Sequence, residues 1–499
     1  VALLLALASA ATWYTLQERS AHPQIVWTAG LSPDRVEQVE AFHGWLRANG
    51  YVDKDGELLF TVRLETTDNQ SALIQAVSGM AGDLIDHVPV KRFAPMGVLE
   101  EITGFARENG LDPAVGYGEA AGDLLMYGGK QYAYFCNLAT RGLLLNLDLF
   151  EKYGVEPPPE EWTPADFERI GREFVRKANA GRPRQEVFFS GAMPQAILPL
   201  ARSLGADVFN ETLTAPALAS EPFLRALALY HRWVAELHLI PTAAELASEN
   251  NQGASVNGEA TPQLAAGRYA MIASGRYVNM DLRRFRSGPV ALSFSQFPEY
   301  GFKNLVFLSR NTAVYKGSKH KEYAKIFLLF LASREYNDII IRDSDGLPPN
   351  PKWAENNPDY RTPPGREYEG NLHANELKWA RTIALPESLS PYYPLADNKI
   401  RYAYERVAGG LSTPEEALAL ANRAIAHAIR ETVAGTASLR EQYERDCALQ
   451  KKIDEYRQSG RKLPAEWIRN TFLRKYYRDN GMLAGETKEA PAQPESEIP

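Results

Sequence analysis

The stretch Gly128–Pro158, with the sequence GGKQYAYFCNLATRGLLLNLDLFEKYGVEPP, decides how the rest of the chain is interpreted. Its apolar run Leu143–Leu147 predicts a buried strand. Asn146 lies in that run and belongs to a residue type that caps helices. We therefore expect a short helix over Leu149–Tyr153 that ends at Gly154.

Strand and helix patterns alternate before this stretch. The apolar segments Gln24–Trp27 and Leu58–Leu64 predict strands, and Asp83–Asp86 predicts the end of a third. Between them, Pro33–Asn49 and Asn69–Met80 carry apolar residues at helical spacing. This order is typical of a parallel sheet with crossover helices, so the expected fold class is α/β.

Length and composition narrow the class of protein. The chain has 499 residues, and a single hydrophobic core stops growing at roughly 250–300, so we expect two or more lobes. The formal net charge of −7 argues against a nucleic acid as partner, because phosphate binding needs a basic face. The two cysteines, Cys136 and Cys447, cannot form a disulfide framework or a metal-binding pair. Cys136 lies in an apolar run, which predicts a buried free thiol.

The two ends of the chain differ from its middle. Val1–Ala11 is apolar, and Ala8-Ser9-Ala10 fits the small-x-small pattern of a cleavage site. Residues 1–20 are therefore expected to be a signal peptide or a membrane anchor, with a buried N-terminal helix as the alternative. Charged and aromatic residues at helical spacing predict a helical appendage over residues 433–480. The segment rich in proline and glutamate that follows predicts a disordered tail over residues 481–499.

Motifs for catalysis are missing from the sequence. The eight histidines are scattered, and the sequence contains no GxSxG, phosphate-binding loop or GxGxxG motif. Residues 53–57 (DKDGE) only partly match a calcium loop, and a polar turn explains them better. We therefore expect a protein that is not an enzyme and that uses no cofactor and no metal.

Several segments, in a fixed order, resemble a known family. Residues 128–167 resemble the first crossing between lobes in the bacterial extracellular solute-binding proteins, the broad family that includes the maltose-binding protein. Further segments that are similar to motifs of this family are Leu264–Tyr277, Val290–Pro298, Asn311–Ser333, Gly346–Pro349 and Leu411–Leu418. The chain departs from the family pattern at Phe135, Tyr277 and Lys303-Asn304, which leaves the identity of the solute open.

The resemblance implies a two-lobed periplasmic-binding-protein-like fold with discontinuous lobes and a C-terminal helical extension. Lobe 1 is expected to comprise residues 24–138 and 291–342, and lobe 2 residues 139–290 and 343–432. The implied function is extracytoplasmic capture of a carbohydrate-like solute for import through an ABC transporter permease. The location would be periplasmic, with or without a membrane anchor. Two alternatives remain, namely a membrane-anchored ligand sensor or adaptor and a carbohydrate-active enzyme.

Nine residues are candidates for contact with the solute. Each also has a structural alternative: a core aromatic, a helix cap, part of a hinge or an exposed loop residue. Arg276 and Tyr277 match the position at which the family often places an aromatic binding residue. The full set is Trp27, Thr28, Asp68, Asn137, Arg141, Arg276, Tyr277, Phe307 and Trp353.

Overall fold

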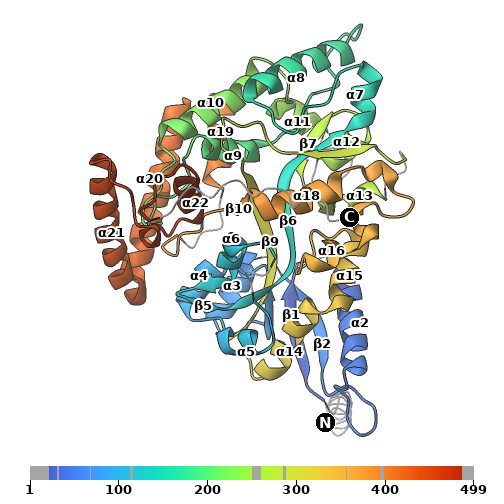
Figure 1. Ribbon diagram of the computed structural model, residues 1–499, viewed down its shortest axis with the longest axis vertical. Coiled ribbons are helices and arrows are strands. Elements are labelled where there is room, and N and C mark those ends of the chain that lie inside the picture. The colour runs from blue at the N-terminus through green and yellow to red at the C-terminus, as the bar shows by residue number, and fades with distance from the viewer. Residues whose placement is uncertain are drawn as a thin grey trace, which may run out of the picture. The chain divides into compact units, whose positions relative to one another are not determined.

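The computed structural model describes residues 22–30, 33–67, 69–112, 116–249, 260–284, 288–355, 357–393 and 398–485. Two compact units divide them. Unit 1 takes the described residues up to Asp112, together with residues 125–136 and 310–339, and unit 2 takes residues 116–124, 137–309 and 340–485. Each unit is therefore built from separate stretches of the chain, which Figure 1 colours by residue number.

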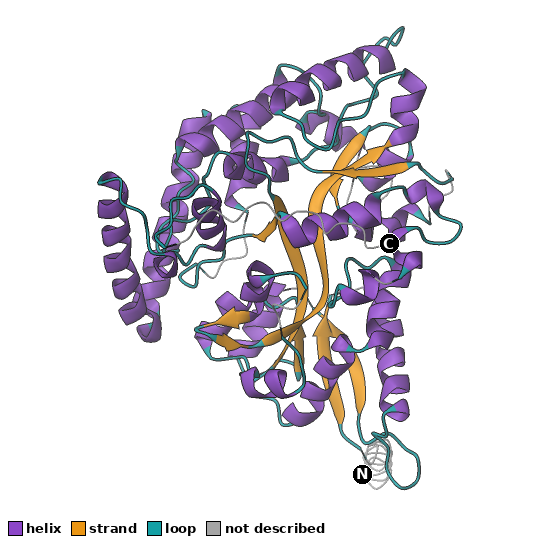
Figure 2. Ribbon diagram, in the orientation of Figure 1, coloured by secondary structure: helices purple, strands orange, loops and turns teal. Residues whose placement is uncertain are grey.

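Unit 1 contains the predicted parallel sheet. Strand β1 (Gln24–Ala29) pairs in parallel with β2 (Thr61–Thr66) and with β3 (Leu84–Asp86). The connections run through helices α2 (Pro33–Ala48) and α3 (Asn69–Val77). The order strand–helix–strand that the sequence predicted is thus confirmed, and Figure 2 shows strands flanked by helices.

One strand of the unit 1 sheet comes from much later in the chain. The end of β9 (Leu305–Val314) pairs antiparallel with β3. Trp27 of β1 packs its ring against Phe327 of α14 (Lys321–Ala332), with 4.8 Å between the centroids. Other elements with residues in unit 1 are α4 (Val90–Phe93), η1 (Ala94–Met96), α5 (Thr103–Glu108), β4 (Met126–Tyr127), β5 (Lys130–Gln131) and α15 (Arg334–Asp343).

The sheet of unit 2 is organised around β6 (Ala133–Asn146), a strand of 14 residues. Its later part pairs antiparallel with β7 (Met271–Ser274) and with β8 (Leu292–Ser295). The predicted strand over residues 143–147 is therefore the end of a longer one. Every residue of β6 is buried except Arg141, which is half-buried. Nearby, β9 also pairs in parallel with the short strand β10 (Ala384–Pro386).

The helix after β6 forms as its sequence predicts. The side chain of Asn146 accepts a hydrogen bond from the backbone N–H of Leu149, at 3.3 Å, and caps helix α7 (Leu147–Tyr153). The helix ends at Gly154, whose φ of 59° lies in the left-handed region that glycine tolerates best. The predicted cap and stop are both confirmed.

Unit 2 has a large apolar core, in which Trp162, Phe167 and Trp233 are each buried. Several of its other helices contribute to this core, and the rest lie elsewhere in the unit. These elements are α6 (Glu119–Gly122), η2 (Asp123–Leu125), α8 (Pro164–Ala178), η3 (Pro194–Ala196), α9 (Ile197–Ser203), α10 (Glu221–Ala235), α11 (Ala243–Glu249), α12 (Thr261–Ala265), η5 (Arg276–Val278), α13 (Asn279–Leu282), α16 (Lys352–Glu355), α17 (Pro358–Arg361), η6 (Glu367–Glu369), α18 (Leu372–Thr382), α19 (Lys399–Ala408) and α20 (Pro414–Gly435).

The C-terminal extension belongs to unit 2. It consists of α21 (Ala437–Gln458), η7 (Ala465–Trp467) and α22 (Thr471–Asp479). An apolar cluster joins it to the rest of the unit, and the buried carboxylate of Glu211 accepts hydrogen bonds from Gln450, Arg457 and Tyr477. The extension is therefore attached to the rest of unit 2 by a shared apolar cluster and by hydrogen bonds to a buried carboxylate.

One predicted lobe boundary differs from the structure, and the two predicted terminal segments lie wholly or largely outside the described residues. Residues 291–309 group with unit 2, because β8 pairs with β6, whereas the sequence analysis assigned them to lobe 1. The other lobe boundaries stay predictions. The predicted N-terminal signal or anchor and residues 486–499 of the predicted tail lie outside the described residues. Within the described residues, no helix combines the length and apolar character needed to cross a bilayer.

Cys136 is a fully buried free thiol, as predicted. Burial raises its pKa to about 12, so the thiol stays protonated. It lies beside Asp86, whose own burial opposes ionisation. The guanidinium of Arg310, 2.6 Å from that carboxylate, nevertheless holds the Asp86 pKa at about 2.

Candidate ligand-binding site

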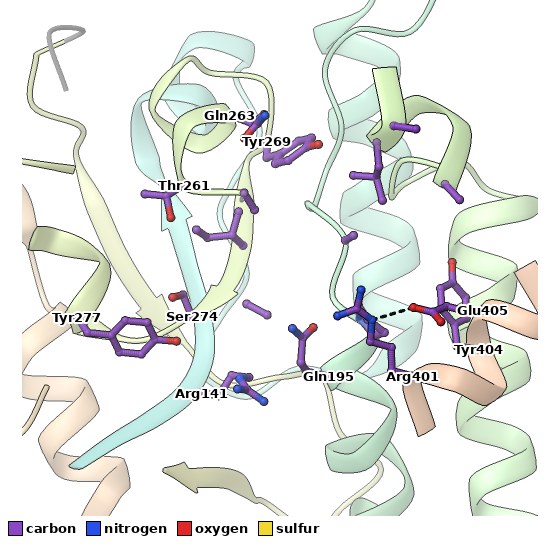
Figure 3. Close-up of a pocket in the computed structure, with 18 residues that line it drawn as sticks. Arg141, Gln195, Thr261, Gln263, Tyr269, Ser274, Tyr277, Arg401, Tyr404 and Glu405 are labelled. Carbon is purple, nitrogen blue, oxygen red and sulfur yellow. Dashed lines mark hydrogen bonds and ion pairs between the residues drawn. The ribbon is translucent and has the colours of Figure 1, made fainter. Parts of the chain in front are cut away.

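Unit 2 contains a cavity of about 570 Å³, within the roughly 300–1,000 Å³ usual for small-molecule sites. Its wall combines one residue of β6, the end of β7 with η5, the segment around η3, and helices α11, α12 and α19. The lining residues are Arg141, Ala192, Pro194, Gln195, Ala243, Leu246, Ala247, Ala260, Thr261, Gln263, Tyr269, Ile272, Ala273, Ser274, Tyr277, Arg401, Tyr404 and Glu405. Figure 3 shows Arg141, Ser274 and Tyr277 on one side, Arg401 and Glu405 on the other, and Gln195 between them.

Several polar groups in the wall lack a protein partner. The Oε1 atoms of Gln195 and Gln263 and the Oγ1 atom of Thr261 are buried and form no hydrogen bond with any described residue. The guanidinium of Arg141 likewise has no ion pair or hydrogen bond within the described part of the chain. Leaving a buried polar group unpaired costs about 1–3 kcal/mol. A ligand with hydroxyl groups would satisfy these atoms.

The two charged residues that α19 contributes to the lining pair with each other, in contrast to Arg141. Arg401 donates from Nε to Oε1 of Glu405 at 2.8 Å, one turn further along the helix. Asn398 caps the helix by accepting the backbone N–H of Arg401. Arg141 is therefore the one cation among the lining residues that a ligand could engage without first breaking an ion pair.

Three tyrosines add aromatic surface to the wall. Tyr277 is half-buried, and Tyr269 is buried. Tyr404 packs edge-on against Tyr230, with the ring centroids 4.7 Å apart, and burial raises the Tyr404 pKa to about 12. A rigid ring fixed in this way can lie against an apolar face of a ligand at small entropic cost.

Two glycines let the strands of the wall approach closely. A Cβ on Gly142 of β6 would lie 2.6 Å from the ring of Phe294. A Cβ on Gly275 would lie 2.7 Å from the carbonyl oxygen of Thr140. Because neither position has room for a side chain, β6 can lie directly against β8 and against the turn after β7, with Arg141 and Tyr277 both at the cavity.

The structure brings two of the nine sequence candidates, Arg141 and Tyr277, to this cavity. Arg276 is fully buried instead. Its guanidinium donates hydrogen bonds to the carbonyl oxygens of Gly346 and Ile341, and it lies 4.6 Å from the ring of Tyr360. Because its side-chain nitrogens donate to acceptors within the protein, Arg276 has a structural role.

Three further candidates in unit 2 also lie away from the cavity lining. Asn137 donates from Nδ2 to the carbonyl oxygen of Asp345 at 2.6 Å. Phe307 is buried against the ring of Tyr117, with 5.9 Å between centroids. Trp353 is half-buried beneath the ammonium group of Lys352, which is 4.6 Å from the ring centroid. A ligand role for these three stays a prediction.

The last three candidates belong to the N-terminal part of the chain. Trp27 and Thr28 are buried in the sheet of unit 1, where the guanidinium of Arg310 lies 5.4 Å from the Trp27 ring. The core alternative therefore describes the observed position of Trp27. Asp68 lies outside the described residues.

Sequence reasoning missed most of the polar wall. Gln195, Thr261, Gln263 and Tyr404 stand in segments that carry no binding motif. Thr261 precedes Pro262, a pair that predicts the start of a helix and gives no indication of a ligand. In addition, no group of three or more His, Cys, Asp or Glu side chains that could hold a metal occurs among the described residues.

The profile of the bacterial extracellular solute-binding protein family matches residues 61–338, more than half of the chain. The protein therefore belongs to this family, which consists of binding proteins, and the resemblance found in the sequence is confirmed. Membership in an extracellular family places the protein outside the cytoplasm.

Solved structures share the two-lobed fold. One is the ABC substrate-binding protein Lmo0181 from Listeria monocytogenes in complex with cycloalternan, with a TM-score of 0.65 and 22% identity over 81% of this chain and 98% of that one. A second is a solute-binding protein from Thermotoga lettingae bound to tagatose, with a TM-score of 0.62 and 17% identity over 82% of this chain and 100% of that one.

A third structure is the maltose/maltodextrin-binding domain MalE from Bdellovibrio bacteriovorus bound to maltotriose. It has a TM-score of 0.61 and 15% identity, and covers 82% of this chain and 100% of its own. At these identities the likeness shows the fold. It confirms the predicted α/β class with two discontinuous lobes.

Proposed function

We propose that this protein binds a carbohydrate in the unit 2 cavity and delivers it to the permease of an ABC importer. The observation that carries the proposal is the combination, in one cavity, of tyrosine rings with an unpaired guanidinium and three unpaired side-chain oxygens. Arg141 contributes only donors, whereas the oxygens of Gln195 and Gln263 contribute only acceptors.

The ligand that fits this wall must both donate and accept hydrogen bonds. Each hydroxyl group of a sugar does both, and the C–H faces of a sugar ring offer apolar surface to Tyr277 or Tyr404. The relatives described above carry cycloalternan, tagatose and maltotriose, which are all carbohydrates. The chemistry of the cavity and the ligands of these relatives therefore support the same class of solute.

Docking on a permease is proposed from family membership. In this mechanism the ligand stabilises one arrangement of a two-state protein because it interacts more strongly with that arrangement. Anchoring through the N-terminus and cleavage of a signal peptide stay predictions from the sequence.

A second candidate function is a ligand sensor or adaptor. The observation that favours it is the part of this chain that the solved relatives do not cover, since they match 98–100% of their own length and only 81–82% of this one. Co-purification of the ligand-loaded protein with a membrane sensor kinase, and not with a permease, would support this candidate over import.

The binding proposal is tested by a thermal-shift screen over neutral and acidic mono- and oligosaccharides, polyols and short peptides. A ligand that binds only the folded state stabilises it by RT ln(1 + [L]/Kd), about 2.7 kcal/mol at a hundredfold excess over Kd. We expect a carbohydrate to raise the melting temperature of the wild-type protein and to have much less effect on Tyr277→Ala.

Two outcomes would overturn the proposal. One is that no carbohydrate in the screen shifts the melting temperature. The other is that a carbohydrate shifts the wild type and Tyr277→Ala equally. Analysis of each stabilising sugar after incubation tests the enzyme alternative, because turnover would consume the sugar whereas binding leaves it unchanged.

A further inference from the structure

Glu376 is a fully buried carboxylate on α18 that accepts two backbone N–H groups. Its Oε1 accepts from Thr140 at 2.9 Å, and its Oε2 accepts from Arg276 at 2.6 Å. These two donors precede Arg141 and Tyr277 directly in the chain. One side chain thus holds the backbone beside both of the sequence candidates that line the cavity.

We propose that Glu376 is a positioning residue for the ligand site: its two carboxylate oxygens fix the backbone segments that carry Arg141 and Tyr277. The proposal rests on the proposed function only in taking these two residues as ligand contacts. Glu376 itself does not line the cavity, so its effect on a ligand would pass through them.

The close fit around Glu376 supports this role. A Cβ on Gly275 would lie 3.0 Å from Oε1 of Glu376 and 2.7 Å from the carbonyl oxygen of Thr140. The turn that leads from β7 into η5 is therefore pressed against both the carboxylate and β6. In so tight a contact, a change at the carboxylate must be taken up by a shift of the backbone on one side.

An ionised carboxylate suits two N–H donors because it accepts on both oxygens. A glutamine amide of nearly the same shape has one oxygen, and its NH₂ group would face the second N–H, donor against donor. Protonation of Glu376 places an O–H on one of these oxygens and makes that oxygen a weaker acceptor for its N–H. Glu376→Gln therefore removes one of the two backbone hydrogen bonds while it preserves side-chain volume.

Burial raises the pKa of Glu376 to about 7, although the N–H groups of Thr140 and Arg276 and the charge of Arg276 oppose this rise. Lowering the pH through 7 should therefore weaken one of the two backbone hydrogen bonds in the unmodified protein. Ligand affinity is expected to fall over the same pH range.

The other titratable groups near Glu376 keep a constant charge in that range. His373, one turn earlier on α18, accepts from Arg276 Nε at Nδ1, and burial holds its pKa at about 4. Glu369 pairs with His373 and Arg283, which hold its pKa at about 2 against the effect of burial. Burial raises the pKa values of Tyr117 and Tyr360 above their usual range. Between pH 5.5 and 8, Glu376 is thus the group of this cluster that titrates.

The first experiment uses the full chain without ligand. Phenylglyoxal modification of Arg141 is followed by peptide mass spectrometry in the wild type, in Glu376→Gln and in the charge-matched control Glu322→Gln, which changes an exposed glutamate of unit 1. Each rate is divided by that of Arg445, an exposed arginine on α21. We expect the ratio to rise at least threefold in Glu376→Gln and to stay unchanged in Glu322→Gln.

The same ratio in the wild type provides a test that needs no variant. It should rise as the pH falls from 8 to 5.5, with a midpoint near 7, and it should be flat in Glu376→Gln. Amide exchange at Thr140 and Arg276 should become at least tenfold faster in Glu376→Gln. Unchanged Arg141 reactivity in Glu376→Gln together with a flat wild-type profile would overturn the proposal.

Maltotriose is the ligand probe in a second experiment, a double-mutant cycle between Glu376→Gln and Arg141→Met. If the wild type binds maltotriose, we expect each variant to bind at least tenfold more weakly. The loss in the double variant should be smaller than the two single losses combined, because the Arg141 contact is then already absent and only the effect of Glu376 on Tyr277 is left. Additive losses would contradict the positioning role. If the wild type does not bind maltotriose, a sugar that stabilises it in the thermal-shift screen replaces maltotriose. If no sugar does, the proposed function fails, while the Arg141 reactivity still decides the role of Glu376.

Discussion

The guanidinium of Arg276 caps the end of helix α15 by donating a hydrogen bond from Nη2 to the carbonyl oxygen of Ile341, at 3.1 Å. A cation at this end of a helix is favourable, because the last carbonyl groups have no partner in the helix and carry partial negative charge. Arg276 also donates to the carbonyl oxygen of Gly346. Both of these acceptors lie just after Ile340, the residue at which the last stretch of unit 2 begins.

Replacing Arg276 should therefore destabilise the fold. Arg276→Met leaves the carbonyl groups of Ile341 and Gly346 without this donor. We expect the free energy of unfolding to fall by about 3–5 kcal/mol, the cost typical of removing one member of a buried charged network. Chemical denaturation measures it. Arg284→Met, an exposed position, serves as the control and should change stability by less than about 0.5 kcal/mol. Equal effects of the two variants would contradict the structural role of Arg276.

Arg141→Met should separate binding from stability. The guanidinium has no partner among the described residues, so its loss leaves no protein group unpaired and the melting temperature should hardly change. Hydrogen bonds to a charged group contribute about 1.5–3 kcal/mol, so carbohydrate affinity should fall by about 10- to 100-fold. Isothermal titration with a sugar from the screen measures this, with Arg445→Met as a control of equal charge change. A large loss of stability in Arg141→Met would show that the side chain has a structural role.

The stability of Glu376→Gln relative to wild type should depend on pH. The folded pKa of Glu376 is about 7, above the usual 4.5, so the folded chain binds this proton more tightly than the unfolded chain. The contribution of Glu376 to stability therefore falls as the pH rises from about 4.5 to 7. As the pH rises from 5 to 7.5, we expect the free energy of unfolding of Glu376→Gln to increase relative to that of the wild type by on the order of 1–3 kcal/mol.

The comparison of the two proteins is needed because His373 has the opposite effect. Its folded pKa is about 4, below the usual 6.5, so its contribution to stability rises with pH over an overlapping range in both proteins. Melting temperatures at half-unit pH intervals provide the measurement. A difference between the proteins that does not change with pH would mean that Glu376 has an ordinary pKa.

The docking of the C-terminal extension can be tested at Gly205. This residue has a φ of 85°, and a Cβ there would lie 2.5 Å from the ring of Tyr476 on α22. Gly205→Ala should cost about 1–3 kcal/mol through backbone strain and steric conflict. Limited proteolysis should then cleave the extension faster. Gly435→Ala is the matched control, since no atom lies within 4 Å of its added Cβ, and it should leave stability unchanged or slightly higher. Equal cleavage rates would show that this contact does not hold the extension.

Much of the fold could be predicted from the sequence because the signals are local. The cap at Asn146 and the stop at Gly154 depend on residues within one helical turn. The parallel pairing of β1 with β2 follows from alternating strands and helices. The antiparallel pairing of β3 with β9 could not be predicted in this way, because it joins residues more than 200 positions apart whose sequences record no preference for each other.

The sequence by itself determined the family, the alternation of strands and helices in the N-terminal part of the chain, and the position of Arg141 and Tyr277 within recognisable motifs. The tertiary structure alone decided which side chains share the cavity and which do not. Arg276 and Tyr277 are adjacent in the chain. After the backbone turn at Gly275, however, the side chain of Arg276 lies in the interior and that of Tyr277 lies at the cavity wall. Gln195 and Tyr404 share the cavity with Tyr277 only because helices and strands pack in a particular arrangement. That arrangement depends on the sum of many distant contacts, and no local motif encodes it.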